Sequence, residues 1–247
     1  MSRKKRIILI SSFCLLGVFI MSLVIATGIY LGTYYHAEDE AVDAFLDNSQ
    51  IETIEIEDGT VAFVPRIAGA GFIFYPGGKV EAEAYYPLME ECAKKGILSV
   101  IVEMPFNLAV FDINGADGIR EEFPNIQRWY IGGHSLGGSM AASYLDSHRD
   151  EYEGIILLGS YSTVDFSDSS IKALSIYGEN DEVLNKEKYE KNISNLPANY
   201  IEHPIKGGNH AGFGMYGEQK GDGEATITNE AQIKETASVI LAFVAVA

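Results

Sequence analysis

Residues 129–138 read WYIGGHSLGG, and this stretch decides the fold. Its first four residues favour a β-strand, and the segment 136–148 has the apolar spacing of a helix. Between them, residues 133–137 fit the pattern GxSxG with Ser135 at its centre. A serine in that pattern occupies a strained strand-to-helix turn, and glycines are needed where strand and helix come close together. We therefore predict a sharp turn at Ser135, with His134 beside it as a packing residue.

Strands alternate with helices along the rest of the body. β-Rich runs bounded by turn residues predict strands at 51–56, 60–64, 71–75, 98–103, 129–132, 154–158, 172–177 and 200–205. Helical spacing predicts helices at 81–95, 136–148, 185–193 and 229–244. This alternation implies an α/β fold, with a mostly parallel twisted sheet and helices on both faces. We assign the fold to residues 51–247 and expect ligands at the carboxyl ends of the strands.

A serine hydroxyl is a poor nucleophile unless a base takes its proton and a third group holds that base. After a turn of this type, the chain order is serine, then an acid, then histidine. Asp181 follows the predicted strand 172–177 and His210 follows the predicted strand 200–205, so both lie at the edge where Ser135 lies. We predict Ser135 as nucleophile, His210 as general base and Asp181 as the acid that orients it. Four carboxylates remain alternatives to this acid: Glu179, Glu182, Asp165 and Asp168.

Acyl transfer also needs N–H donors for the oxyanion that forms on the substrate. One donor is expected at Leu136, the residue after the nucleophile, and the other in the loop that follows the third predicted strand. We favour the backbone N–H of Gly78, because a glycine lets the backbone approach a substrate closely. Its neighbours Gly77 and Lys79 could serve instead.

The N-terminus combines a basic cluster with a long apolar segment. Residues 1–6 hold four basic side chains, and 25 uncharged residues follow at 7–31. As a helix this segment spans about 37 Å, which exceeds the roughly 30 Å of bilayer hydrocarbon. The basic cluster favours a cytoplasmic start, which places the domain outside the cell membrane. We predict a single-pass signal anchor at 7–31 and a tether at 32–50; the alternative is a cleaved signal and a secreted protein.

The charge of the body limits its partners. Beyond residue 32 the chain carries 14 basic against 35 acidic side chains, a formal charge of −21. Such a surface repels phosphate polymers, so nucleic acid is not expected as a partner. Because Cys14 lies in the apolar N-terminal segment and Cys92 in the body, we expect no disulfide between them. We find no metal-ligand spacing and expect no metal or cofactor; the expected partners are a small acyl substrate and the membrane.

Several stretches of the body carry a family likeness: FIFYPGGKV at 72–80, MPFNLA at 104–109, GGHSLGG at 132–138, GEND at 178–181 and GNH at 208–210. Together they resemble the α/β-hydrolase superfamily, and more narrowly its dienelactone-hydrolase-like group, also called α/β-hydrolase fold family 5. The resemblance implies the α/β-hydrolase fold and the triad Ser135, Asp181 and His210. It does not imply lactone specificity, because dienelactone hydrolases use a cysteine nucleophile where this chain has Ser135. Many esterases have histidine where this chain has Pro76.

The motif, the chain order and the resemblance together predict a serine hydrolase that acts on ester-type acyl bonds through an acyl-enzyme. A carboxylesterase-like activity is the first expectation. An exopeptidase or a lipid acyl hydrolase on the same fold remains open, and so does a non-catalytic binding or scaffold protein.

Overall fold

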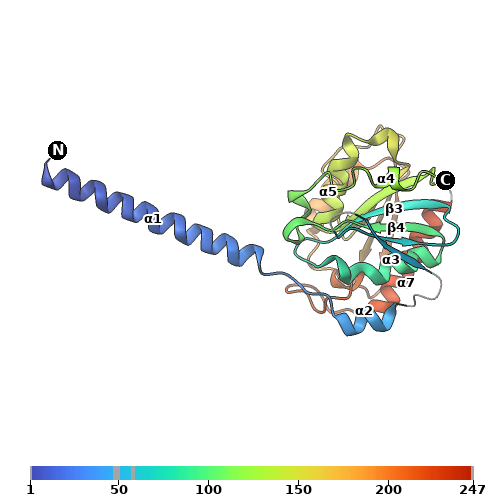
Figure 1. The fold of residues 1–247 in the computed structure, drawn as a ribbon. Coiled ribbons are helices and arrows are strands. Elements are labelled where there is room, and N and C mark those ends of the chain that lie inside the picture. The colour runs from blue at the N-terminus through green and yellow to red at the C-terminus, as the bar shows by residue number, and fades with distance from the viewer. Residues whose placement is uncertain (1, 47–50, 57–58, 246–247) are drawn as a thin grey trace. The chain divides into compact units, whose positions relative to one another are not determined.

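The computed structural model describes residues 2–46, 51–56 and 59–245, and it divides into two units (Figure 1). The first unit, Met1–Tyr34, contains the single helix α1 (Arg3–Leu31). The stretch Ser12–Leu31 of this helix is long and apolar enough to cross a membrane. Length and composition are also those of a signal sequence, so the helix fits either an anchor or a signal.

The second unit is built on one sheet. In the described residues this sheet has eight strands in the order β1-β2-β4-β3-β5-β6-β7-β8. Neighbours from β4 to β8 in that order pair in parallel, whereas the pairs β1–β2 and β2–β4 are antiparallel. The strands are β1 (Glu52–Glu55), β2 (Val61–Val64), β3 (Ala70–Tyr75), β4 (Ile97–Ile101), β5 (Trp129–His134), β6 (Gly154–Leu158), β7 (Lys172–Gly178) and β8 (Ile201–Ile205).

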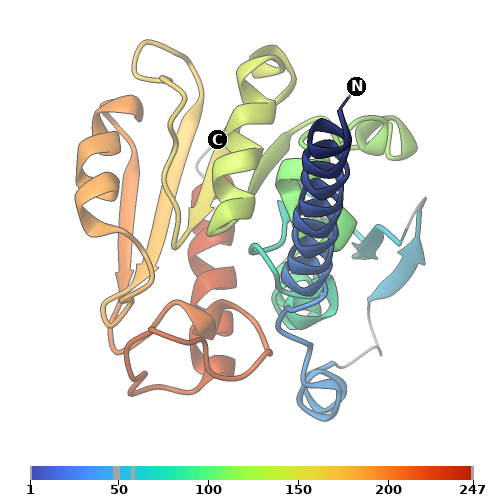
Figure 2. The same cartoon turned by 90° about the vertical axis from the view of Figure 1, so that its left-hand side faces the viewer.

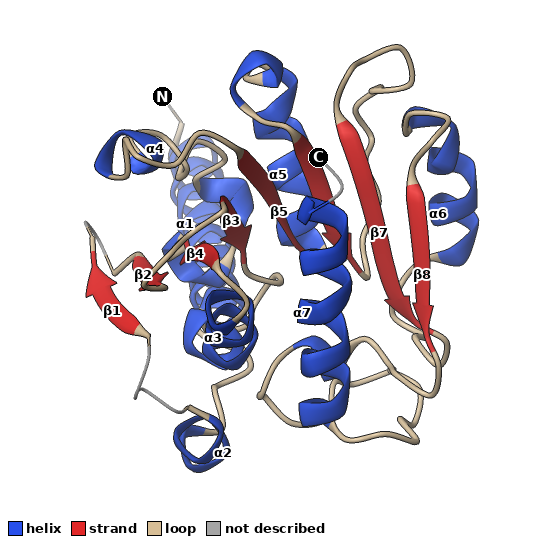
Figure 3. Cartoon of the chain, turned by 90° about the vertical axis from the view of Figure 1, so that its right-hand side faces the viewer, coloured by secondary structure: helices blue, strands red, loops and turns tan. Residues whose placement is uncertain are grey.

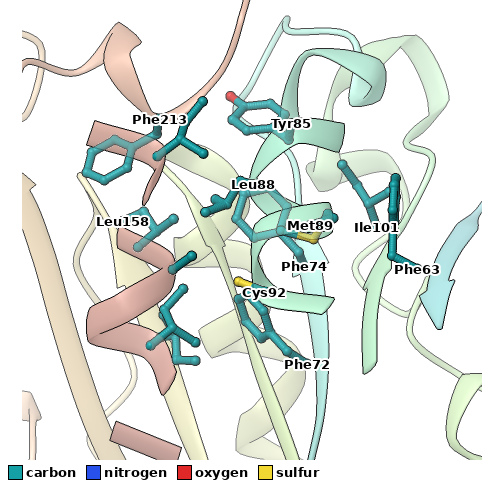
Figure 4. Close-up of a cluster of buried hydrophobic side chains, with 14 of the residues drawn as sticks. Phe63, Phe72, Phe74, Tyr85, Leu88, Met89, Cys92, Ile101, Leu158 and Phe213 are labelled. Carbon is teal, nitrogen blue, oxygen red and sulfur yellow. The ribbon is translucent and has the colours of Figure 1, made fainter. Parts of the chain in front are cut away.

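Helices cover both faces of this sheet. Helices α3 (Tyr86–Lys94) and α7 (Asn229–Ala245) lie on one face (Figure 3), and α5 (Leu136–Asp146) and α6 (Lys186–Asn192) lie on the other (Figure 2). Side chains of β3 alternate between two cores, because Phe72 and Phe74 pack towards α3 whereas Ile73 and Tyr75 pack towards α5. Figure 4 shows the first of these cores. The predicted α/β class, with a mostly parallel sheet and helices on both faces, is confirmed.

Shorter elements connect the strands and helices. They are α2 (Asp39–Phe45), α4 (Ile119–Glu122), η1 (Ala82–Tyr85), η2 (Pro105–Asn107), η3 (Ala109–Phe111), η4 (Arg149–Glu151), η5 (Ile193–Asn195) and η6 (Ala211–Phe213).

The compact body begins earlier than the sequence predicts. The second unit, Tyr35–Ala247, starts within the segment 32–50 that was expected to be a tether. The N–H of Tyr35 donates to the carbonyl of Lys79 (2.7 Å), and Val42 of α2 is buried in the core that contains α3. The boundary therefore moves from residue 51 to Tyr35, because the apolar side of α2 packs on the body. Residues 47–50 of the expected tether lie outside the described residues.

Parallel pairing brings the ends of β3, β5, β6, β7 and β8 to one edge. Tyr75 pairs with Gly133, His134 with Leu158, and Gly178 with Ile205. The loops that carry the predicted site residues all leave the sheet at this edge, which is where ligands bind in open α/β sheets.

The central strands at this edge approach too closely for a side chain at Gly132. A Cβ there would lie 2.0 Å from the carbonyl oxygen of Ile156 on β6. That oxygen belongs to the sheet backbone, so it cannot move aside as a flexible side chain would. Glycine at this position is therefore a steric requirement of the pairing between β5 and β6.

We predict that Gly132→Ala destabilises the protein by about 3 kcal/mol, the upper range for a side chain forced into a packed interior. The emission of Trp129, the one tryptophan of the chain, follows urea unfolding because its ring is buried. Gly69→Ala is the matched control, since the nearest neighbour to a Cβ there is 4.0 Å away. Equal unfolding midpoints for the two variants would contradict the steric account.

Candidate active site

Ser135 lies at the turn between β5 and α5 in a strained backbone conformation, with φ 51° and ψ −120°. Such angles are rare for a non-glycine residue and persist only where the surroundings enforce them. The surroundings are tight: a Cβ at Gly137 would lie 2.2 Å from the carbonyl oxygen of Pro76. The backbone of Ser135 is also held, because its N–H donates to the Leu158 carbonyl (2.9 Å) and its carbonyl accepts from the Ser160 hydroxyl (2.6 Å).

Asp181 and His210 form a buried hydrogen bond from the loops after β7 and β8. The distance from His210 Nδ1 to Asp181 Oδ2 is 2.7 Å, and both side chains are about 1% exposed. The other carboxylate oxygen, Oδ1, accepts from the backbone N–H groups of Val183 (2.9 Å) and Leu184 (2.7 Å). Both oxygens of Asp181 are thus engaged, which fixes the plane of the carboxylate. The four alternative acids, Glu179, Glu182, Asp165 and Asp168, are exposed.

The second nitrogen of His210, Nε2, is buried and has no hydrogen-bond partner among the described residues. No hydrogen bond therefore joins His210 to the Ser135 hydroxyl in this structure. The two residues are nonetheless neighbours through Gly159, which follows the strand end that binds the Ser135 N–H. A Cβ on Gly159 would lie 3.0 Å from His210 Nδ1 and 3.2 Å from Asp181 Oδ2, and its φ is 49°. The sequence does not single out Gly159, because a single glycine after a strand has no motif that distinguishes it from an ordinary turn.

A second imidazole, that of His134, packs against His210. The centroids of these two rings are 4.3 Å apart, and the centroid of the Phe213 ring lies 5.4 Å from that of His134. His134 Nδ1 hydrogen-bonds the hydroxyl of Tyr85 (2.8 Å), which accepts in turn from the N–H of Gly77 (3.2 Å). Burial, and secondly the charge that His210 can carry, lower the pKa of His134 well below its ordinary value, so this ring stays neutral. Figure 4 shows Tyr85 and Phe213 at one end of the buried core.

The loop after β3 presents one unengaged backbone donor. The N–H of Gly77 is taken by Tyr85, and the N–H of Lys79 donates to the carbonyl of Asn107 (2.6 Å). For Gly78, by contrast, the described structure shows no acceptor within hydrogen-bond reach. Gly78 lies against Leu136, the other residue predicted to donate to the oxyanion, since a Cβ on Gly78 would be 2.8 Å from Leu136 Cδ2.

A cleft of about 230 Å³ opens beside Ser135. Its walls come from α5 and from the loops after β6 and β7: Ser135, Leu136, Ser139, Gly159, Ser160, Tyr161, Val183, Leu184 and Asn185. The cleft therefore borders the Asp181–His210 pair through Gly159 and Leu184. Within the described ranges, no three His, Cys, Asp or Glu side chains are grouped as metal ligands would be.

Comparisons with known proteins agree with this architecture. A model of the alpha/beta hydrolase family matches residues 71–234. Among solved structures, TT1662 from Thermus thermophilus is 15% identical with a TM-score of 0.59, covering 79% of this chain and 97% of its own. A "predicted CIB-like hydrolase" from Thermoplasma acidophilum is 18% identical with a TM-score of 0.54, covering 78% and 98%. At these identities the structural likeness shows the fold, that of α/β-hydrolases. No curated protein matches.

We predict that Tyr85→Phe destabilises the protein by about 1–3 kcal/mol, because it leaves the Gly77 N–H and His134 Nδ1 buried without their partner. Urea unfolding measures the change. Tyr130→Phe is the matched control, since the Tyr130 hydroxyl is buried without a hydrogen-bond partner in the described structure. Removal of the Tyr130 hydroxyl should leave the free energy of unfolding unchanged or raise it slightly. If Tyr130→Phe lowered that free energy as much as Tyr85→Phe, the role given to the Tyr85 hydroxyl would be contradicted.

Proposed function

Because this chain belongs to the alpha/beta hydrolase family, we propose that it is a serine hydrolase that cleaves ester-type acyl bonds. Ser135 is the nucleophile, His210 the general base and Asp181 the acid that orients the base. The observation that carries the proposal is the buried Asp181–His210 hydrogen bond next to the strained turn at Ser135. The substrate is a small acyl compound, and the proposed chemistry uses no cofactor.

The hydrogen bonds of Asp181 support this division of roles. An ionised carboxylate only accepts hydrogen bonds, so the proton of a neutral His210 lies on Nδ1, facing Asp181. Nε2 then keeps its lone pair, and it has no other partner among the described residues. That nitrogen is available to take the proton of Ser135. In free enzymes such a hydrogen bond is often long or poorly aligned, and it tightens when substrate is bound.

The reaction follows in two stages. Ser135 Oγ attacks the ester carbonyl while His210 Nε2 takes its proton, and the carbonyl oxygen becomes an oxyanion. When the tetrahedral intermediate collapses, the leaving alkoxide takes that proton from His210 and an acyl-enzyme remains. Water then attacks the acyl carbon with His210 again as base, and collapse of the second intermediate returns the proton to Ser135 Oγ and releases the acid.

We propose the N–H groups of Gly78 and Leu136 as the oxyanion donors. Gly78 is favoured over Gly77 and Lys79 because those two N–H groups are already engaged. Leu136 is the first residue of α5, where backbone N–H groups have no intrahelical acceptor. Each such donor typically contributes a factor of about 10²–10³ in rate.

We also propose that α1 anchors the chain in the cell membrane, with residues 35–247 outside the cytoplasm. The four basic residues that precede its apolar stretch support this orientation. Protease added to intact cells should then digest the body while α1 stays with the membrane. A body that is protected until the cells are lysed would overturn the orientation, and a body recovered from the medium would indicate a cleaved signal.

We expect a fluorophosphonate probe to label the protein at Ser135 and the wild type to hydrolyse a short-chain nitrophenyl ester. Ser135→Ala should abolish labelling and reduce kcat/KM by at least about 10³-fold. Asp181→Asn should reduce kcat by about 10³–10⁴-fold, because an amide there favours the wrong tautomer of His210.

Ser143→Ala serves as the control, since Ser143 lies about two turns beyond Ser135 along α5 and its hydroxyl donates to the Ser139 carbonyl. Labelling that survives in Ser135→Ala would reject the nucleophile. A wild type that neither reacts with the probe nor hydrolyses esters would favour a non-catalytic protein.

A further inference from the structure

The segment after β4 carries three exposed apolar side chains on two successive 3₁₀ turns. Phe106 is 59% exposed, Val110 45% and Phe111 55%. The rings of Phe106 and Phe111 contact each other edge to face, with centroids 5.7 Å apart. We call these three residues the aromatic patch. A contiguous apolar patch on a soluble surface is a common mark of a binding site.

The backbone under the aromatic patch is strained. Phe106 has φ 57° and Asn107 has φ 55°, a left-handed conformation that is unfavourable for a bulky side chain. Packing does not compensate for this strain, because the Phe106 ring is largely in solvent. Strain of this kind collects at ligand-binding and catalytic sites, where the local geometry serves function rather than stability.

The aromatic patch is joined directly to the proposed oxyanion loop. The carbonyl of Asn107 accepts from the N–H of Lys79 (2.6 Å). Leu108, which lies between the two 3₁₀ turns, is buried, and its Cδ2 lies 3.6 Å from where a Cβ of Gly78 would be. The patch therefore adjoins the position at which the substrate carbonyl oxygen would bind.

The cleft beside Ser135 suits the leaving group. A leaving oxygen must come within reach of His210 to receive its proton. The cleft beside Ser135 includes Gly159, which is packed against His210, and Leu184, whose N–H binds Asp181. A leaving group in this cleft places the acyl chain on the other side of the carbonyl, towards Gly78.

We propose that the aromatic patch is a subsite for the apolar acyl chain of the ester, so that the protein prefers medium-chain over acetyl substrates. The inference rests on the proposed serine hydrolase function. A bilayer surface is the less favoured occupant, because the body carries a formal charge of −21 and would be repelled by anionic lipids.

The test compares nitrophenyl acetate with nitrophenyl octanoate on the full-length protein in lipid nanodiscs. The double variant Phe106→Asn/Phe111→Asn removes both rings, and asparagine tolerates the left-handed conformation at position 106. Since a fully buried methylene contributes about fourfold in affinity, we expect kcat/KM for the octanoate to fall about tenfold. The acetate should change by less than about twofold.

Ile67→Asn is the matched control. Ile67 is 85% exposed and lies between β2 and β3, before the amino end of β3 and so at the opposite edge of the sheet. It should behave as the wild type with both esters. An unchanged octanoate-to-acetate ratio in the double variant would overturn the subsite, and so would an equal loss in Ile67→Asn.

A second measurement separates this inference from the proposed function. Binding of 2-butanone and 2-decanone, which cannot be hydrolysed, is measured by calorimetry with the wild type and the double variant. If the wild type binds 2-decanone more tightly than 2-butanone and the double variant does not, the subsite is supported even if no ester is cleaved. Equal preference for 2-decanone in both proteins overturns it, whether or not Ser135 proves catalytic.

Discussion

The buried hydrogen bond between Asp181 and His210 is the constraint on which the rest of the site depends. Burial of an ionisable group costs free energy unless its polar atoms are hydrogen-bonded. The carboxylate of Asp181 meets this condition, because it accepts three hydrogen bonds. Those bonds come from the loop after β7 and from the loop after β8, which are parallel neighbours. The topology of the sheet therefore brings the acid and the imidazole together, and the network leaves His210 Nε2 as the one polar atom of the pair without a partner among the described residues.

Close approach of the backbone brings this pair next to Ser135, the proposed nucleophile. Gly137 packs against the carbonyl of Pro76 at a distance that excludes a Cβ. Gly159 packs against both members of the pair, where a Cβ would be a tight contact and the positive φ also favours glycine. Close packing also brings Gly78 against Leu136. The two proposed oxyanion donors therefore lie together because the loop after β3 contacts the turn at Ser135. Steric limits at a few glycines thus connect sheet packing to the geometry of the proposed catalytic groups.

The sequence predicted those features that follow from local pattern and chain order. The turn at Ser135 was visible because strand, glycines and helix are contiguous, and Asp181 and His210 could be located because loops after parallel strands share an edge. Gly159 and Tyr85 were not identified, since their importance arises from contacts across the fold that no local pattern encodes. The start of the compact body was misplaced for the same reason: the pairing of Tyr35 with Lys79 is a long-range contact. Strand ends were also less predictable, and β4 stops at Ile101, two residues before the predicted end at residue 103.

The ring centroids of two imidazoles lie 4.3 Å apart in this site, and their environments differ in a way that suits the two roles proposed for them. His210 has a carboxylate partner, which stabilises the positive charge that forms when it takes a proton. His134 hydrogen-bonds the neutral hydroxyl of Tyr85, and burial keeps its pKa low. A charged His134 would repel a charged His210 and weaken the base, whereas a neutral ring supports it by packing alone. The hydroxyl of Tyr85 also accepts from the N–H of Gly77, so one buried side chain connects the proposed oxyanion loop to the ring that packs against the proposed base. The geometry thus separates proton transfer, which the mechanism assigns to His210, from positioning, which falls to the His134–Tyr85 pair.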